Sequence, residues 1–305
     1  MCTPVIHVMG EALVDLIIRP DGSLSAVTGG GPFNLARAAA RLGAPVTFAG
    51  GISDDAFGAR IMEQLHLDGV ITPLVQRHGL PTTLALASVD VAGTATYTFY
   101  TQGTAAAEVS AHEIAPGPGV TVLATGTLGL VMEPVASSIE SVLRDASDEM
   151  LVFVDPNCRP SVITDRDSYV ERLLRMLAHA DVVKVSTEDM EFLRPGIAPA
   201  SAAAALLDIG PSSVLLTDGG RAVTVLHRRG RDIVPVPRVD VVDTVGAGDA
   251  FGGAFLAFWS ADGRGRADID DVAALIDTAH RAVQVSAITC TREGADPPRL
   301  AELGG

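Results

Sequence analysis

Residues 242–255 read VDTVGAGDAFGGAF, and this glycine-rich stretch is the most informative part of the 305-residue chain. Small residues at 246–248 let the backbone turn freely, and an apolar run of helical character follows directly. A helix that begins here would direct its first N–H groups and the positive end of its dipole at one point. One interpretation is a plain helix start with Asp249 in its first turn. The other is an anion-binding turn with a carboxylate base beside it.

From about residue 120 onward, the sequence alternates between short apolar segments and longer helical ones. Such alternation predicts a parallel sheet with right-handed crossovers and helices on both faces. The predicted strands are VTVLATG (120–126), LVFVDPN (151–157), DVVKVS (181–186) and the paired SVLLTDGG (213–220) and AVTVLHR (222–228). The predicted helices lie at about 133–147, 166–180, 248–260 and 270–288, with a short helix and an alanine-rich stretch (199–209) among them.

The first hundred residues combine two patterns. Strands at VIHVM (5–9) and 45–53, with helices at 34–43 and 55–69, continue the α/β pattern. Segments 11–30 and 82–103 are instead rich in β-forming residues, and 82–100 is typical of a hairpin that turns at Gly93.

We therefore expect a single α/β domain over residues 1–305. It should have three αβα layers with a mostly parallel central sheet, plus a small β-sheet lid formed by about 11–30 and 82–103. The exposed strand edges of this lid need covering, which predicts a homodimer through the lid. The polar tail at 292–305 is expected to pack loosely.

Composition narrows the class of protein. Apolar residues make up 48% of the chain, charged residues make up 19%, and no apolar run is long enough for a membrane span. A net charge of −15 repels nucleic-acid backbones, so no nucleic-acid partner is expected. Three widely spaced cysteines and the absence of an N-terminal secretion signal predict reduced thiols and a cytoplasmic protein. The seven histidines show no zinc-binding spacing.

Polar residues follow most of the predicted strands, and ligands of open α/β sheets bind beyond the carboxyl ends of the strands. Residues in these positions are Gly10, Asp15, Asp155, Asn157, Arg159, Ser186, Asp189, Gly219 and Gly220, together with the GAGD turn at 246–249. We expect them to line one crevice.

The GAGD turn suits phosphoryl transfer. Positioning and charge stabilisation carry most of that barrier, so an ionised Asp249 could orient a hydroxyl toward a phosphate held by the turn amides and then accept its proton. Such a pocket needs no Lys or Arg. Other phosphate-binding devices are excluded, because the chain lacks the G-x-x-x-x-G-K-S/T loop, the dinucleotide fingerprint and the protein-kinase signatures. A nicotinamide dehydrogenase is thereby also excluded.

Five motifs in this order resemble those of the ribokinase-type (pfkB) carbohydrate kinase family. They are GGGPFNLARAAARLG (29–43), GISDDAFG (51–58), DPNCRPSV (155–162), DTVGAGDAF (243–251) and TREGADPP (291–298). The third motif is similar to the D-x-N-x-R element of fructokinases and 2-keto-3-deoxygluconate kinases. The resemblance runs the length of the chain and implies a ribokinase-like fold.

The resemblance implies an ATP-dependent, fructokinase-like kinase that phosphorylates a primary hydroxyl of a small sugar. It implies Mg²⁺ as a cofactor and, as in relatives that hold a monovalent cation, K⁺. The implied catalytic residues are Asp249, Gly246, Ala247, Gly248 and Arg159. The implied sugar-binding residues are Asp15, Gly30, Gly31, Asn34, Phe99 and Asp249. The implied nucleotide contacts are Lys184, Ser186, Thr217, Gly219, Gly246, Gly248 and His280. Asp189 would hold Mg²⁺ through water, and Asp243 would lie near a monovalent cation.

Some positions depart from the family pattern. The family's N-x-x-E appears here as Ser186-Thr187-Glu188-Asp189, which shortens the acidic side chain. Fructokinases often carry an arginine and an acid where this chain has FYTQGTAA (99–106). A 2-keto-3-deoxygluconate kinase or another sugar kinase of the family is therefore an alternative. A non-catalytic sugar-binding or regulatory protein is a third, although such a protein has no need of Asp249.

Overall fold

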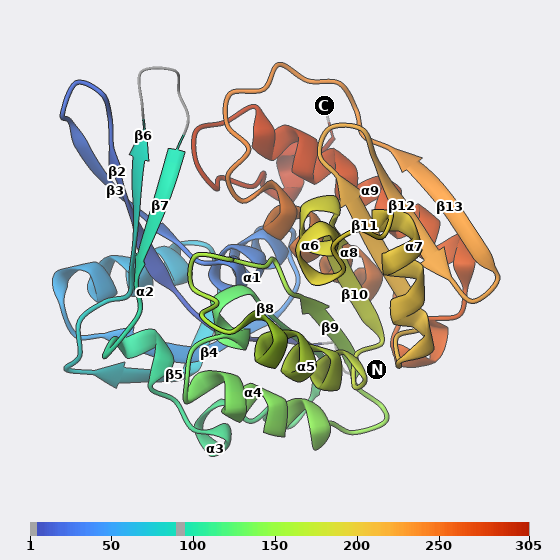
Figure 1. Ribbon diagram of the computed structural model, residues 1–305, viewed down its shortest axis with the longest axis horizontal. Helices are drawn as coiled ribbons and strands as arrows, with labels where there is room; N and C mark the ends of the chain where they lie inside the picture. The colour runs from blue at the N-terminus through green and yellow to red at the C-terminus, as the bar shows by residue number, and fades with distance from the viewer. Residues whose placement is uncertain (1–4, 90–94, 305) are drawn as a thin grey trace.

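The computed structural model describes residues 5–89 and 95–304, and within them a large sheet of nine strands forms the centre of the molecule (Figure 1). Across the sheet the strands are β13 (Gly230–Pro235), β12 (Ala222–His227), β11 (Ser213–Asp218), β10 (Val182–Ser186), β9 (Leu151–Asp155), β8 (Val120–Gly126), β1 (Val5–Met9), β4 (Val46–Ser53) and β5 (Ile71–His78). All neighbours from β11 to β5 pair in parallel, and only the β11–β12 and β12–β13 pairs are antiparallel. The mostly parallel sheet is thus confirmed.

Helices cover both faces of this sheet because its strands are apolar on both sides. In β9, for example, Phe153 packs into one hydrophobic cluster and Val152 and Val154 into the other. One face is covered by α1 (Gly31–Arg41), α2 (Ala56–Leu67), α8 (Ala247–Ala261) and α9 (Val272–Cys290). The other is covered by α3 (Ala111–Ile114), α4 (Val135–Arg144), α5 (Arg166–Leu177), α6 (Thr187–Leu193) and α7 (Pro199–Ala204). The predicted three αβα layers are confirmed.

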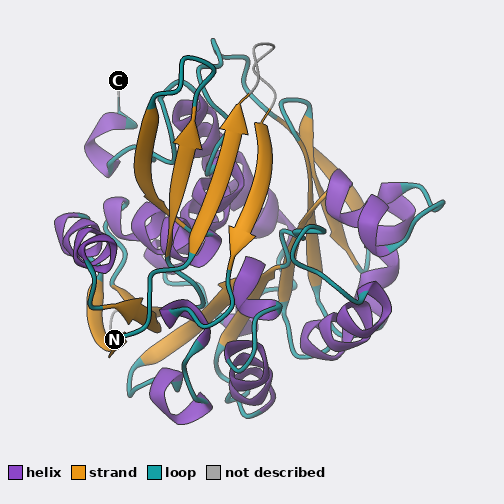
Figure 2. Cartoon of the chain, turned by 60° about the vertical axis from the view of Figure 1, so that its left-hand side comes forward, coloured by secondary structure: helices purple, strands orange, loops and turns teal. Residues whose placement is uncertain are grey.

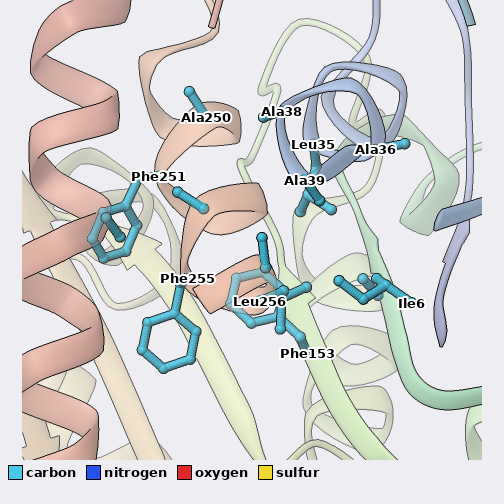
Figure 3. Close-up of a cluster of buried hydrophobic side chains, with 14 of the residues drawn as sticks. Ile6, Leu35, Ala36, Ala38, Ala39, Phe153, Ala250, Phe251, Phe255 and Leu256 are labelled. Atoms are coloured by element: carbon cyan, nitrogen blue, oxygen red, sulfur yellow. The ribbon is translucent and has the colours of Figure 1, made fainter. Parts of the chain in front are cut away.

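Helix α8 is the centre of the core, and its glycines let it approach α1 closely (Figure 3). A Cβ on Gly253 would lie 2.5 Å from the backbone oxygen of Leu35, so only glycine permits this contact. Phe255 stacks between Phe153 and Trp259, and all three side chains are fully buried. Burial of each aromatic ring contributes about 1.5–3 kcal/mol, so the helix that carries the GAGD turn is firmly anchored.

A separate four-stranded sheet stands beside the main domain as the predicted lid (Figure 2). Its strands, in order, are β3 (Leu24–Gly29), β2 (Leu13–Ile18), β6 (Leu84–Val89) and β7 (Ala95–Tyr100). Asp15 pairs in register with Ala85, which in turn pairs with Phe99, so these side chains share one face. The predicted turn at Gly93 lies outside the described residues.

The sequence patterns missed two edge strands and the short helix α3. Strand β5 contains Pro73, which indicates a loop by composition but is tolerated in a strand at the edge of a sheet. Strand β13, at the opposite edge, is mostly exposed and buries only Val234, so it lacks the apolar pattern of a covered strand. In the described part of the chain, no helix is both long and apolar enough to cross a membrane.

The expectation that the tail at 292–305 packs loosely is wrong. The Arg37 side chain donates to the backbone oxygen of Ala295 at 3.0 Å, and Arg41 pairs with Asp296. Pro297 and Pro298 are buried. Buried arginines on α1 thus fix the tail, which the polar composition of the tail itself does not reveal.

Candidate active site

The first turn of α8 has N–H groups available for an anion. Gly246 precedes the helix with φ 73°, a left-handed conformation that favours glycine. The Ala247 N–H donates to the Thr244 oxygen at 3.3 Å, and Ala250 donates to Gly246 at 2.8 Å. Within residues 5–89 and 95–304, the N–H groups of Gly248 and Asp249 donate to no protein acceptor. Of the predicted anion-hole residues in the described chain, Gly246 and Gly248 therefore have free amides, Ala247 does not, and Asp249 contributes a further one.

Asp249 lies buried at this turn and is held by Asn34 of α1. The Asn34 Nδ2 donates to Asp249 Oδ2 at 2.9 Å, while Asn34 Oδ1 is buried without a partner. Burial raises the pKa of Asp249, and the nearby Lys184, Asn34 and Arg159 oppose that rise. The raised pKa allows the Asp249 carboxylate to accept a proton, and the Asn34 side-chain amide fixes its orientation.

Two predicted sugar-site glycines allow close packing at the start of α1, and Gly31 lies beside Asp249. A Cβ on Gly31 would lie 2.1 Å from Thr127 Oγ1 and 3.5 Å from Asp249 Oδ1. Gly30 has φ 111°, and a Cβ there would lie 2.8 Å from the backbone oxygen of Glu11. Larger residues at either position would displace the start of α1, and with it Asn34.

The lid contributes Asp15 to the same space. Burial raises the pKa of Asp15 to about 6; Arg159 lowers it and Asp249 raises it further, so these three groups lie within electrostatic reach of one another. Arg159 is held at the end of β9 by Asn157, whose Oδ1 accepts from Nη1 at 2.5 Å. Phe99 shares the lid face of Asp15. The structure therefore brings the predicted sugar-binding residues and Arg159 together around Asp249.

A buried ion pair lies beneath the turn. Lys184 Nζ of β10 is 2.8 Å from Asp155 Oδ2 of β9, and both side chains are almost fully buried. A Cβ on Gly248 would lie 2.7 Å from Lys184 Nζ. The sequence indicated an anion pocket without a cationic side chain, but the structure places the chain's single lysine directly against it.

The predicted nucleotide contacts on β10 and β11 are neighbours. Ser186 and Thr217 are opposite each other in the parallel register, and Gly219 follows β11 with φ 50°. Asp189 accepts from the Ser186 N–H at 2.8 Å and from the Cys158 N–H at 2.7 Å. It thereby ties the start of α6 to the loop after β9, and both of its oxygens accept backbone N–H groups.

Asp243 joins the loop before α8 to the C-terminal tail. Its Oδ1 accepts from the Val245 N–H at 3.0 Å, and its Oδ2 accepts from the Gly294 N–H at 2.9 Å. A Cβ on Gly246 would lie 2.4 Å from the Ala295 Cβ, so the tail also packs against the anion-binding turn.

His280 stands apart from these groups. It is exposed on α9, and among the described residues no hydrogen bond or ion pair joins it to another predicted site residue. A surface groove of about 710 Å³ between α7 and the β12–β13 turn contains none of the predicted site residues either. The chemistry-bearing groups gather instead around Asp249.

The sequence patterns missed two site residues, Glu11 and Thr127. Glu11 is fully buried and accepts from the N–H groups of Gly31 (3.2 Å) and Gly129 (2.8 Å), which fixes the start of α1. Its burial raises its pKa to about 8. Thr127 has φ 51°, which is rare for a threonine. Glu11 lies two residues after the end of the first buried strand, so its position near a strand exit was the available signal.

Comparisons with known proteins agree with this geometry. The model of the pfkB family of carbohydrate kinases matches residues 5–301. A fructokinase of Rhizobium leguminosarum bv. trifolii is 34% identical over 259 residues, which cover 81% of this chain and 77% of that protein.

Two solved structures extend the similarity to the fold. A fructokinase from Xylella fastidiosa with bound ATP superposes with a TM-score of 0.91 at 27% identity, covering 99% of this chain and 97% of that one. A double mutant of the Vibrio cholerae O395 fructokinase, with fructose, ADP and potassium bound, has a TM-score of 0.88 at 26% identity, covering 99% and 97%. The chain therefore belongs to the pfkB family of carbohydrate kinases and is a fructokinase-like enzyme that transfers a phosphate to a sugar hydroxyl.

Proposed function

We propose that this protein phosphorylates a primary hydroxyl of fructose, with ATP as the phosphate donor. One observation carries the proposal: a buried Asp249, oriented by Asn34, lies beside the two free amides that open α8. A base for a hydroxyl and a cradle for a phosphoryl group are thus next to each other, as in-line transfer requires. The fructose- and ATP-bound relatives support the choice of substrates.

In this mechanism the sugar hydroxyl loses its proton to Asp249 as its oxygen attacks the γ-phosphorus of ATP. The bond from the γ-phosphorus to the bridging oxygen breaks, and ADP leaves. The N–H groups of Gly248 and Asp249 stabilise the charge on the transferring group. Asp15, Gly30, Gly31, Asn34 and Phe99 hold the sugar, and Arg159 lies beside its reacting end.

We assign the nucleotide to the ends of β10 and β11 and the start of α8. The paired positions of Ser186 and Thr217 support this assignment, as does the left-handed Gly219 that lets the chain turn away from a ligand. Lys184, Gly246 and Gly248 would face the phosphates. His280 would border the base, which its exposed position on α9 permits.

The residues near Lys184 fit Mg²⁺ held through water and phosphate oxygens. Mg²⁺ keeps several waters and needs only one or two carboxylates, and Asp189 is a buried carboxylate that faces the loop after β9. Asp189 would hold the waters of such an ion, which would neutralise phosphate charge. For a monovalent cation such as K⁺, the loop joined by Asp243 and Gly294 is the proposed place.

A neutral sugar suits the site better than an acidic one. Asp15 and Asp249 face the same space, and Arg159 is the cation that opposes them. A sugar acid would be repelled by the two carboxylates. Arg159 is nevertheless the feature that favours the alternative, a 2-keto-3-deoxygluconate kinase, because a guanidinium binds carboxylates well.

A coupled assay of ADP release tests these assignments. The purified protein is assayed with ATP and Mg²⁺ on fructose, 2-keto-3-deoxygluconate, ribose and a nucleoside, and kcat/KM is compared. We expect fructose to give the highest value. A higher value for 2-keto-3-deoxygluconate would favour the alternative, and turnover of none of them would leave a sugar-binding or regulatory protein.

We further propose that the lid closes over the sugar and that it pairs with the lid of a second copy. Strands β3 and β7 form its edges and carry exposed apolar side chains, among them Leu24 (61% exposed) and Tyr100 (54%). Closure would exclude water and so limit ATP hydrolysis. Sedimentation should show a dimer at micromolar concentration, which a lysine at Tyr100 should weaken. The free Cys158 and Cys290 agree with a cytoplasmic location.

A further inference from the structure

Asp155 is the last residue of β9, and Lys184 lies in the middle of the adjacent parallel strand β10. Val183 of β10 pairs in register with Val154 of β9, and Lys184 and Asp155 are the next residue on each strand. Their side chains are only 5% and 6% exposed, and the ammonium is 2.8 Å from Asp155 Oδ2. The second oxygen, Oδ1, is buried without a partner. The Lys184 ammonium is therefore the side-chain partner that Asp155 has among the described residues.

The cation at this place is the single lysine of a chain that has 21 arginines. An ammonium is a compact point charge, whereas a guanidinium is a broad planar fork. The space here is narrow, because a Cβ on Gly248 would already lie 2.7 Å from the lysine Nζ. The ammonium thus lies against the first turn of α8, next to the free amide of Gly248.

Three carboxylates compete for this ammonium. Burial lowers the pKa of Lys184, but Asp155, Asp189 and Asp249 together raise it above its ordinary value, so the side chain is charged at neutral pH. Of these acids, Asp155 alone among the described residues lies within ion-pair distance. Asp189 is occupied by backbone N–H groups, and Asp249 by Asn34.

This arrangement decides whether Asp249 can act as a base. If the ammonium paired with Asp249 instead, the carboxylate would be tied up and its affinity for a proton would fall. We propose that Asp155 is a positioning residue, which holds the Lys184 ammonium under the Gly248 turn and away from Asp249, so that the cation serves the transferring phosphoryl group. The inference rests on the kinase function proposed above.

A double-mutant cycle tests this role. We expect Asp155→Asn to lower kcat with fructose by about 10²-fold, while the KM for fructose changes less than about threefold, because the sugar contacts remain. Lys184→Met should lower kcat at least as much. In the Lys184→Met background, Asp155→Asn should cause little further loss, because it acts through the lysine. Asp155→Glu, which keeps the charge, should restore part of the rate.

Asp181→Asn is the matched control. Asp181 is a buried carboxylate that precedes β10, at the opposite end of the same strands, where it accepts from the Val152 N–H and from Arg266. Its substitution should lower the melting temperature without changing kcat at temperatures where the protein is folded.

Thermal unfolding is measured for each variant to show that it is folded, because Asp155→Asn leaves a buried ammonium unpaired. If that variant does not fold, the doubly neutral Asp155→Asn/Lys184→Met protein and Lys184→Met alone still give one side of the cycle. Equal losses from Asp155→Asn in both backgrounds, or a wild-type kcat in the folded single variant, would overturn the proposal. An inactive wild-type protein would instead count against the proposed function.

Discussion

Buried carboxylates at the two ends of the main sheet are satisfied in opposite ways. At the amino ends of the strands, Asp68 accepts from Arg37, Arg41, Gln64 and Arg299, so both of its oxygens have partners. At the carboxyl ends, by contrast, buried oxygens of Asp155 and Asn34 have none. Native proteins pair nearly all buried polar atoms, so these two oxygens, which lie close to Asp249 and Lys184, are candidate contacts for a ligand.

The pKa values of the two groups follow the same division. Burial raises the pKa of Asp68, but Arg41, Arg37 and Gln64 bring it below its ordinary value, so folding favours the ionised form. Burial raises the pKa of Asp155 to about 6 despite Lys184, and it also raises that of Asp249. The ion pairs of Asp68 thus stabilise the fold at the amino end of the sheet. At the carboxyl end, Asp155 and Asp249 are left less fully paired and are available to a substrate.

Among the variants, we expect the largest loss of kcat from a substitution of Asp249. Asp249→Asn should lower kcat on the order of 10³-fold, because the amide cannot accept the sugar proton. The melting temperature should stay the same or rise, since a buried charge is removed. A coupled ADP assay measures kcat, and thermal unfolding measures the melting temperature. A variant that keeps more than a tenth of the wild-type kcat would exclude Asp249 as the base.

Asp68→Asn should show the reverse behaviour. It leaves the arginines of α1 buried beside a neutral group, and breaking a buried ion pair of this kind costs about 3–5 kcal/mol. The free energy of unfolding, from urea titration, should fall by that amount. Asp21→Asn is a control, because Asp21 lies in an exposed turn, where it accepts from the Ser23 N–H. A loss below about 1 kcal/mol would show that the cluster behaves like a surface pair.

Gly248→Ala should affect only the carboxyl end of the sheet, and its effect on kcat should be smaller than that of Asp249→Asn. Alanine normally stabilises a helix relative to glycine, yet here its Cβ would push the Lys184 ammonium aside. We expect kcat to fall by about 10²-fold at an unchanged melting temperature. Gly265→Ala is the matched control, because a Cβ there meets no atom within 4 Å. Equal kcat values for both variants would contradict the close contact.

Features of the fold and of the site that depend on local sequence patterns could be predicted from the sequence. The layers, the main helices and the grouping of Asp15, Arg159 and Asp249 follow from apolar patterns and from residues placed at strand exits. Those signals are local, so one chain is enough to read them. The resemblance to carbohydrate kinases supplied the roles that the patterns alone left open.

The missed features depend on contacts between distant segments. Strand β5 is held by its pairing with β4, and the tail is held by Arg41 of α1, so the composition of either segment alone is misleading. The partner of Lys184 is likewise fixed by strand order, which places β9 beside β10. Glu11 was missed because its burial under α1 depends on how distant segments pack around it.

Glu11 should give an effect on stability that depends on pH. Its pKa is about 8 in the folded protein against an ordinary value of 4.5, so the native state binds one more proton than the unfolded state between these values. Stability should therefore fall as pH rises from about 5 to 8, with a contribution of up to about 1.4 kcal/mol per pH unit. Glu11→Gln removes that slope, and any constant cost of the amide leaves the slope unaffected. Urea unfolding at pH 5, 6, 7 and 8 measures both proteins. Parallel curves would mean that Glu11 is ionised in the folded crevice, and the unpaired oxygens of Asp155 and Asn34 would then be the remaining sign that this end is built for a ligand.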